Sequence, residues 1–435
     1  ELAHAFDASF HEVQWIVLAY LLASTTLIVS VGRLADITGR RRLLLAGILL
    51  FTIASVLCSV APTLGLLIAA RAVQGLGAAV MMALAIALVG ETVPKAQTGR
   101  AMGLLGTMSA IGTALGPSLG GLLIDGFGWP AIFLVTVPLG LLTFLLAHRH
   151  LPVDRRVTTR AKFDVVGTLL LALTLGAYAL AMTIGRGRFG PLNVALLVGA
   201  GCGICVFVFV ETRAAAPLIR LAMVRALRGN LAMSALVSTV MMATLVVGPF
   251  YLSRGLELDG VLVGLVLSAG PLVAALTGVP AGRIADQFGA RRTTTVGLVV
   301  LAAGCLTLAA LPAGSGIAGY IAAVAVITIG YALFQTANNT AVMADVLPDH
   351  RGVISGLLNL SRNLGLITGA SVMGAVFAAA SATSDIATAP PDAVTAGMRV
   401  TFVVATLLIL GALAIAAGGR ILAPSRAGRV IARVT

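Results

Sequence analysis

The most constraining feature of the chain is a long series of apolar stretches that recur from Val13 to the C-terminus. Each holds about 18 to 25 residues, enough for a helix to cross the roughly 30 Å of hydrocarbon in a bilayer. Only 10% of the residues are charged and the mean hydropathy is +1.05, whereas ordinary soluble domains carry about one quarter charged residues. The pattern therefore predicts an all-α integral membrane protein and excludes a water-soluble fold.

Thirteen of these stretches are predicted to be membrane spans. The connections between them are mostly short and hold Gly, Pro and charged residues, as expected where the backbone leaves the hydrocarbon. The predicted spans cover residues 13–32, 43–61, 64–90, 100–124, 130–147, 164–184, 191–210, 230–252, 261–282, 294–311, 316–344, 353–380 and 397–418.

The basic residues indicate how the spans are oriented. The chain carries 29 Lys and Arg residues, and most of them lie in alternate connections and in the C-terminal tail. The positive-inside rule makes that side, with the C-terminus, cytoplasmic. The net charge of +13 is spread over short clusters between spans rather than one face. The basic residues are therefore explained by the orientation of the chain in a lipid bilayer, and we expect no nucleic-acid partner.

Two further expectations follow from the ends and the composition of the chain. Thirteen spans with a cytoplasmic C-terminus place Glu1 on the outer face, and no signal peptide precedes it. We therefore hypothesise one more helix upstream of Glu1. Arg far outnumbers Lys, and Ala and Gly abound, as in proteins of GC-rich bacteria. The expected location is the bacterial cytoplasmic membrane.

One loop sequence of the chain occurs twice. Residues 32–42 read Gly-Arg-Leu-Ala-Asp-Ile-Thr-Gly-Arg-Arg-Arg, and residues 282–292 read Gly-Arg-Ile-Ala-Asp-Gln-Phe-Gly-Ala-Arg-Arg. A second pair of similar segments, at residues 91–105 and 345–358, lies at nearly the same offset. Two such matches indicate two homologous halves, the architecture of secondary transporters that bind their substrate between the halves.

Three motifs carry a resemblance to a known family. The pattern Gly-x-Leu-Ala-Asp-x-x-Gly-Arg-Arg stands at residues 32–41, a second motif at residues 71–78, and a glycine-rich, antiporter-type motif at residues 112–121. In these motifs the chain resembles the major facilitator superfamily over essentially its whole length. The resemblance implies a fold of two six-helix halves.

The additional spans narrow this resemblance. Two predicted spans, residues 164–184 and 191–210, lie between the halves, and Gln14 and Trp15 open the first visible span. These features resemble the fourteen-span drug:proton antiporter family. They imply two inserted spans and a first helix that is missing from this chain and carries an Asp in that family.

The expected domain organisation has four parts. Residues 1–150 form the N-terminal half, with five of six helices present, and residues 151–228 form a linker with the two additional spans. Residues 229–420 form the C-terminal six-helix half, and residues 421–435 form a basic cytoplasmic tail.

The repeated loops combine an acid with arginines at helix ends. They are read either as topology determinants in a solvated loop or as a latch, in which a carboxylate docks on a helix N-terminus. Such docking is favoured by about 0.3 to 2 kcal/mol, enough to bias two nearly balanced states. For Asp36 we expect the helix start near residues 352–355 as the docking partner. The gating candidates are Asp36, Gly32, Gly39, Arg40, Asp286, Gly289, Gly116, Pro117, Gly120 and Gly121.

The glycine-rich run at residues 112–121 has a structural and a functional interpretation. Small residues four apart let helices approach closely. Pro117 removes an intrahelical hydrogen bond and can kink the helix, which creates a pliable seam.

Two arginines lie inside predicted spans, where an unpaired charge is costly. Arg71 and Gln74 project from one helix face, whereas Arg362 is either a cavity residue or a structural arginine that caps carbonyl groups. No acid lies at mid-depth of a span. We therefore expect the principal coupling acid upstream of Glu1, with Arg71 modulating its charge and Asp125 as the best alternative within this chain.

Polar residues on otherwise apolar spans are candidates for the substrate cavity. Each is read equally well as an interhelical hydrogen-bonding group. Adjacent amides at Asn338 and Asn339 point to different faces, so one must find a partner elsewhere. The candidates are Tyr20, Thr25, Gln335, Asn338, Asn339 and Asn359.

The leading hypothesis is a proton-coupled antiporter that exports small lipophilic or cationic compounds. The chain contains no phosphate-binding loop of the Gly-x-x-x-x-Gly-Lys-Ser/Thr type, which favours an ion gradient as the energy source. The alternatives are an exporter of one endogenous metabolite or antibiotic and, more remotely, an intramembrane transferase. We expect no enzyme activity, no cofactor and no metal, and a protein that functions as a monomer.

Overall fold

The computed structural model describes residues 5–7, 10–154, 164–184, 190–214, 217–344, 346–347, 350–381 and 390–422. The side chains of Phe10, His11, Gln14, Pro117, Ser118, Gly121, Asp125, Ala313 and residues 419–422 lie outside this description, as do residues 423–435. Three predicted site residues, Pro117, Gly121 and Asp125, are therefore placed only by their backbone.

Helices make up nearly all of the described chain, and no strand occurs among those residues. This confirms the predicted all-α class, because inside a bilayer only helices and closed barrels satisfy every backbone amide and carbonyl. The α-helices are α2 (Phe10–Thr38), α3 (Arg40–Ser59), α4 (Leu64–Thr92), α5 (Thr98–Phe127), the short α6 (Ala131–Leu134), α7 (Thr136–His150), α8 (Val165–Thr183), α9 (Pro191–Arg213), α10 (Leu221–Phe250), α11 (Gly260–Phe288), α12 (Ala290–Ala309), α13 (Gly316–Met343), α14 (Arg351–Ala380) and α15 (Pro391–Leu422).

Twelve helical segments of the described chain are long and apolar enough to cross a membrane, with α6 and α7 counted as one. The span predicted at residues 100–124 is not among the twelve, but it forms the 30-residue helix α5. The fourteen-span arrangement remains a prediction.

Short polar side chains fix several helix starts. Thr63 accepts a hydrogen bond from the amide of Leu66, Asp164 from that of Gly167, and Asp259 from that of Leu262. Each bond satisfies an amide that has no partner inside its own helix.

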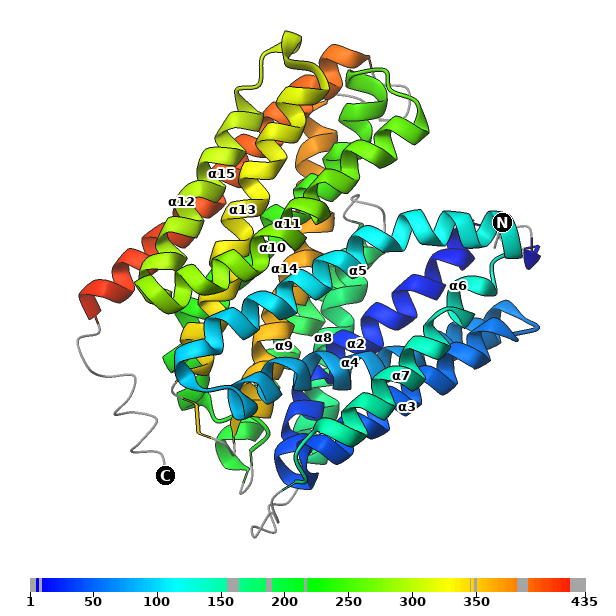
Figure 1. The fold of residues 1–435 in the computed structure, drawn as a ribbon, viewed down its shortest axis with the longest axis vertical. Coiled ribbons are helices and arrows are strands. Elements are labelled where there is room, and N and C mark those ends of the chain that lie inside the picture. The colour runs from blue at the N-terminus through cyan, green and yellow to red at the C-terminus, as the bar shows by residue number, and fades with distance from the viewer. Residues whose placement is uncertain are drawn as a thin grey trace.

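The helices form two bundles that diverge at one end (Figure 1). The N-terminal bundle contains α2 to α7, and the C-terminal bundle contains α10 to α15. Helix α5 packs on α11 and α2 packs on α14, so the bundles meet along two seams. Helices α8 and α9 pack on one another, and α8 also contacts α2 and α14.

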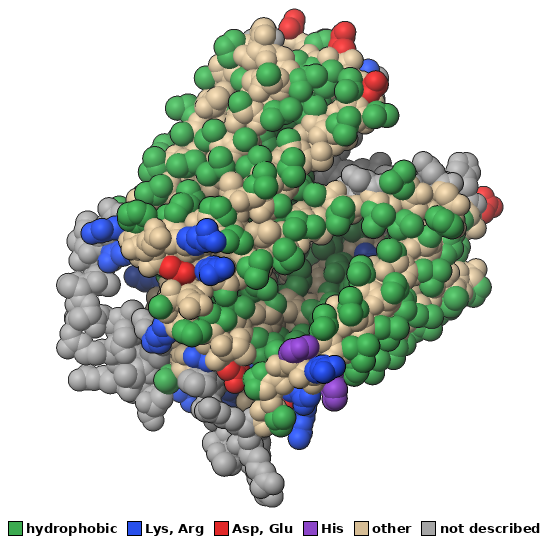
Figure 2. Space-filling view, in the orientation of Figure 1, with side chains coloured by type: hydrophobic (Ala, Val, Ile, Leu, Met, Phe, Trp, Pro, Cys, Tyr) green, Lys and Arg blue, Asp and Glu red, His purple; other side chains and the backbone are tan. Residues whose placement is uncertain are grey.

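The charged residues distinguish the two ends of the structure. Arginine clusters stand at the starts of α3 and α12. Most Lys and Arg side chains in view lie toward one end, whereas apolar side chains cover the flanks (Figure 2). We call the end that contains residues 36–42 and 286–292 the basic end. The two bundles are in contact there and separate toward the opposite end (Figure 1).

Candidate functional site: a cavity closed at the basic end

Asp36 lies at the end of α2 and contacts the first turn of α14. Its Oδ1 accepts a hydrogen bond from the amide of Gly352 at 3.0 Å, and its Oδ2 accepts one from the amide of Val353 at 3.1 Å. This is the helix start that the sequence predicted as the docking partner. The free amides and the helix dipole favour a carboxylate at this place. We call the contact the first latch.

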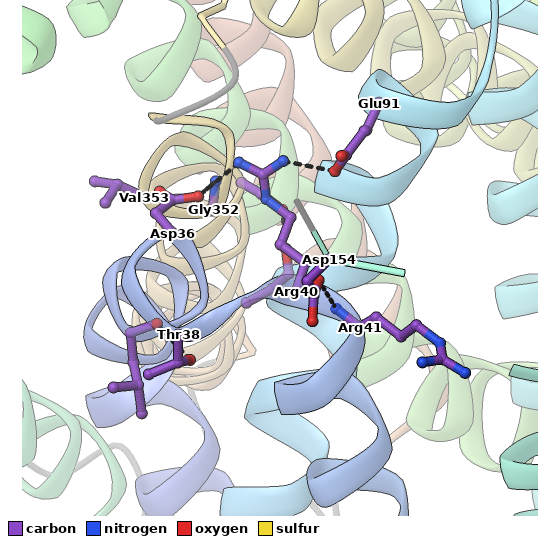
Figure 3. A network of polar contacts seen from close by, with 11 residues as sticks. Asp36, Thr38, Arg40, Arg41, Glu91, Asp154, Gly352 and Val353 are labelled. Atoms are coloured by element: carbon purple, nitrogen blue, oxygen red, sulfur yellow. Dashed lines mark hydrogen bonds and ion pairs between the residues drawn. The ribbon is translucent and has the colours of Figure 1, made fainter. Parts of the chain in front are cut away.

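An ion-pair network holds the Asp36 carboxylate in place (Figure 3). The guanidinium of Arg40 is 2.7 Å from Asp36 Oδ1 and 2.7 Å from Glu91 Oε2. The Asp36 side chain is only 1% exposed, and that of Arg40 is 9% exposed. Because the pair is shielded from water, its attraction is weakly screened. The network therefore joins the end of α2, the start of α3 and the end of α4 within the N-terminal bundle. The same carboxylate then contacts α14 in the other bundle.

Asp286, the repeat counterpart of Asp36, makes the equivalent contact across the other seam. Its Oδ1 accepts a hydrogen bond from the amide of Gly99 at 2.7 Å, and its Oδ2 accepts one from the amide of Arg100 at 2.8 Å. Both amides belong to the first turn of α5. This second latch therefore ties the C-terminal bundle to a helix start in the N-terminal bundle.

Glycines bring the backbones of the two bundles into direct contact beside each latch. A Cβ added to Gly32 would lie 2.2 Å from the carbonyl oxygen of Gly352, and one added to Gly282 would lie 2.3 Å from that of Gly99. Real Cβ atoms do not approach backbone oxygens so closely. The basic end closes in this way only because these positions lack side chains.

The turns that follow the two latches also require glycine. Gly39 has a φ of 105° and Gly289 a φ of 85°, a region that L-residues with a side chain rarely adopt. Each residue ends one helix and begins the next, so it sets the angle between α2 and α3 or between α11 and α12.

The glycine run on α5 corrects one prediction. Close helix packing was expected at residues 112–121, but a Cβ added to Gly112, Gly116 or Gly120 would meet no atom within 4 Å. The close contacts of α5 instead lie near the basic end, where a Cβ on Gly103 would lie 2.2 Å from the carbonyl oxygen of Gly278. The predicted packing is absent because α5 and its neighbours separate toward the opposite end in this conformation.

Arg71 on α4 is held by α2 and by its own helix. Its Nε donates to the carbonyl oxygen of Ile16 at 3.1 Å, and its Nη1 donates to Gln74 Oε1 at 2.5 Å. The guanidinium lies 4.4 Å from the centre of the Tyr20 ring. Gln74 in turn donates a hydrogen bond to Ser55 Oγ at 2.7 Å, which extends the network to α3. The predicted shared face of Arg71 and Gln74 is present, and their role in proton coupling remains a prediction.

A cavity of about 500 Å³ lies between the bundles on the open side of the latches. Helices α4 and α5 line it from the N-terminal bundle, and α10, α11, α13 and α14 line it from the C-terminal bundle. The lining is mostly apolar, with Met82, Met102, Met241 and Leu267 among its residues. Its size and character suit a small lipophilic molecule.

The predicted cavity residues fall into two groups. Gln335, Asn339 and Asn359 line the cavity. Asn338 is fully buried and accepts a hydrogen bond from Asn230 at 2.8 Å, which confirms that the adjacent amides have separate surroundings.

Thr25 and Tyr20 are not among the described residues that line this cavity. Thr25 instead accepts a hydrogen bond from Asn363 at 3.3 Å and so joins α2 to α14. Asn359 also joins the bundles, because its amide donates to the carbonyl oxygen of Met82 at 3.1 Å.

Arg362 projects from α14 into the cavity lining. Its Nε is buried and has no hydrogen-bond partner among the described residues. The structural interpretation, in which this arginine caps carbonyl groups, is therefore not supported by any contact in that part of the chain.

Sequence reasoning missed Asp154, which lies after α7. Its carboxylate accepts hydrogen bonds from the amides of Arg41 at 2.8 Å and Arg42 at 3.0 Å, and it thereby caps α3. No motif marks this residue. The arginine-rich start of α3, which lacks a capping side chain of its own, is the one signal that pointed to a partner from elsewhere.

The chain was compared with known proteins. A family model described as Major Facilitator Superfamily matches residues 1–370 and 231–433. Multidrug resistance protein Stp of Mycobacterium tuberculosis is 33% identical over 394 residues, which cover 87% of this chain and 71% of that protein. Riboflavin transporter RibZ of Clostridioides difficile is 29% identical over 382 residues, which cover 87% and 82%.

Solved structures show the same fold. The crystal structure of the human organic anion transporter MFSD10 superposes with a TM-score of 0.65 at 16% identity, and the match covers 94% of this chain and 83% of that one.

Proposed function

Because the chain belongs to the Major Facilitator Superfamily, a family of membrane transporters, we propose that it exports small lipophilic compounds in exchange for protons. The observation that carries the proposal is the apolar cavity between the bundles, which is closed by two latches at the basic end. Relatives named a multidrug efflux pump and a drug efflux pump, at 30% and 31% identity, support export of drug-like compounds.

The proposed cycle alternates access to this cavity. The basic end faces the cytoplasm, with the C-terminus on that side, because of the positive-inside rule. In the conformation described, both latches are closed, so a compound in the cavity leaves toward the opposite face. Opening both latches and closing the other end returns the cavity to the cytoplasmic side. The two bundles move about a fixed binding site, and one chain suffices for the cycle.

The sequence-based expectation included cationic compounds. No acidic residue is among the described residues that line the cavity, so the proposal keeps the lipophilic class and not the positive charge. Protons remain the proposed driving ion, since they supply an inward gradient in bacteria, and Arg71 and Asp125 remain candidates near the coupling site.

A second candidate is an exporter of one metabolite. It is favoured by the relative named a riboflavin transporter, which matches 87% of this chain. The two candidates differ in breadth: a multidrug pump acts on several unrelated compounds, and a metabolite exporter acts on one.

The test measures accumulation of two neutral lipophilic dyes, nile red and N-phenyl-1-naphthylamine, and of riboflavin in cells with and without the protein. The multidrug proposal predicts lower accumulation of at least one dye, and loss of the difference when a protonophore is added. Lower accumulation of riboflavin alone would favour the metabolite exporter. Export that depends on ATP and resists the protonophore would contradict the antiport mechanism.

A further inference from the structure

The cavity has an unbalanced charge. Arg362 is the one charged side chain among the described residues that line it, and none of the others is Asp, Glu, His or Lys. The remaining polar side chains of the described lining are neutral: hydroxyls of Ser, Thr and Tyr residues, and amides that include Gln335. An arginine stays ionised in any protein environment, so the cavity carries a permanent positive charge.

The two arginines within the spans show how unusual Arg362 is. Arg71 has a carbonyl oxygen, an amide oxygen and an aromatic ring as partners. The Nε of Arg362, in contrast, is buried without a hydrogen-bond partner among the described residues. A buried N–H without an acceptor is costly, because a hydrogen bond lost to water is not replaced. The rest of the Arg362 side chain is partly exposed, so its guanidinium is accessible to a molecule that enters the cavity.

A planar guanidinium selects its partner by geometry and charge. It donates two parallel hydrogen bonds to a carboxylate, and such charge-assisted bonds are roughly twice as strong as neutral ones. An apolar surround lowers the local dielectric constant and strengthens the attraction further. The positive charge of Arg362 repels a cation, and the described lining holds no carboxylate that could bind one.

We propose that the compounds bound in this cavity are amphipathic acids, in which an apolar body contacts the methionine and leucine side chains and a carboxylate or similar anion pairs with Arg362. This inference rests on the proposed export function and names its substrate class. The Gln335 side chain lines the same cavity. A carboxamide carries an NH₂ donor as well as an acceptor oxygen, so its Nε2 can donate a further hydrogen bond to the anion.

The test uses three probes with one apolar body and different charges. They are 1-pyrenebutyric acid, its neutral carboxamide, and the corresponding pyrenebutyl trimethylammonium ion. Binding of each to the purified full chain in lipid nanodiscs is measured at pH 7.5 by pyrene fluorescence, with empty nanodiscs subtracted. The acid is expected to bind about tenfold or more tightly than either other probe.

Variants assign the preference to one side chain. Arg362→Gln is expected to bring binding of the acid to the level of the carboxamide while leaving the carboxamide unchanged. Arg362→Lys keeps the charge without the paired donors and is expected to retain part of the preference. Arg254→Gln removes an equal charge from an exposed position in the turn that follows α10 and is the matched control.

The outcomes separate this inference from the export proposal, because binding and transport are measured independently. The amphipathic-acid inference would be overturned if the ammonium probe bound as tightly as the acid, if all three probes bound equally, or if the acid did not bind. Equal weakening of all three probes by Arg362→Gln would also overturn it. Preferred binding of the acid without its transport into inside-out vesicles would support the inference and contradict the export proposal.

Discussion

The two latches share their hydrogen bonds but differ in what supports them. Asp36 and Asp286 each accept two amide hydrogen bonds from a helix start in the opposite bundle. Asp36 is also paired with Arg40, which in turn pairs with Glu91. In the second loop the position equivalent to Arg40 is Ala290, and Asp286 forms no ion pair within the described chain. The amide hydrogen bonds that close the two latches are thus equivalent. Only the first latch is supported by an ion pair.

This difference indicates a division of roles between the seams. At α5 and α11 the carboxylate is held by helix amides alone, so its contact is worth about 0.3 to 2 kcal/mol. At α2 and α14 the buried Arg40 orients the carboxylate before docking, and it would keep only Glu91 as a partner if the aspartate were removed. The first latch is therefore expected to control closure more strongly than the second.

The largest expected effect tests the close glycine contacts that the two latches share. Gly32→Ala and Gly282→Ala each place a methyl group against a backbone oxygen, which prevents closure at the basic end. Both variants are expected to lose at least about tenfold in the initial rate of dye export from vesicles, with similar losses at the two sites. Gly264→Ala, where a Cβ meets no atom within 4 Å, is the control. A large loss at one site only would mean that the seams do not close together.

The second prediction tests the ion pair that supports Asp36 but not Asp286. Asp36→Asn removes the charge that Arg40 neutralises, whereas Asp286→Asn weakens only helix-terminal contacts. We expect the export rate to fall about tenfold for Asp36→Asn and about two- to threefold for Asp286→Asn. Membrane content is measured in parallel by immunoblot. Equal rates for Asp36→Asn and the unmodified protein would rule out the first latch, and loss of insertion would favour the topology interpretation of the loop.

The smallest expected effect comes from making the second loop resemble the first. Ala290→Arg places a guanidinium four residues after Asp286, as Arg40 stands after Asp36. Such a pair is worth about 0.3 to 0.5 kcal/mol, so the midpoint of thermal unfolding should rise slightly. Ala290→Gln has a long side chain without charge and is the control. A rise of the same size in both variants would show that helix propensity, not ion pairing, is responsible.

Much of this arrangement was predictable because it follows from local pattern and repetition. Apolar length gave the helices, and the repeated loop identified both aspartates and the helix start that Asp36 contacts. The different surroundings of Asn338 and Asn339 followed from the 100° turn between adjacent helix residues. These features depend on sequence spacing alone.

Other features depend on how distant helices are rotated and on which end is closed. The Arg40–Glu91 pair joins residues from α3 and α4, and nothing in either segment states that the side chains meet. The glycine run on α5 favoured close packing, but its neighbours are separated in this conformation. Whether Arg362 capped carbonyl groups or faced a cavity was likewise undecidable from the span in which it lies.

The α8–α9 hairpin has a consequence for how the molecule moves. The Tyr178 hydroxyl hydrogen-bonds that of Thr368, and the Ser371 hydroxyl donates to the carbonyl oxygen of Met182, so both contacts attach α8 to α14. Toward α2, Leu171 and Leu175 of α8 belong to the same buried apolar cluster as Ile28 and Val29. The hairpin therefore contacts both bundles, through hydrogen bonds on the side of α14 and apolar packing on the side of α2. It covers the seam between these two helices in this conformation, and any relative movement of the bundles must rearrange one of its two contacts.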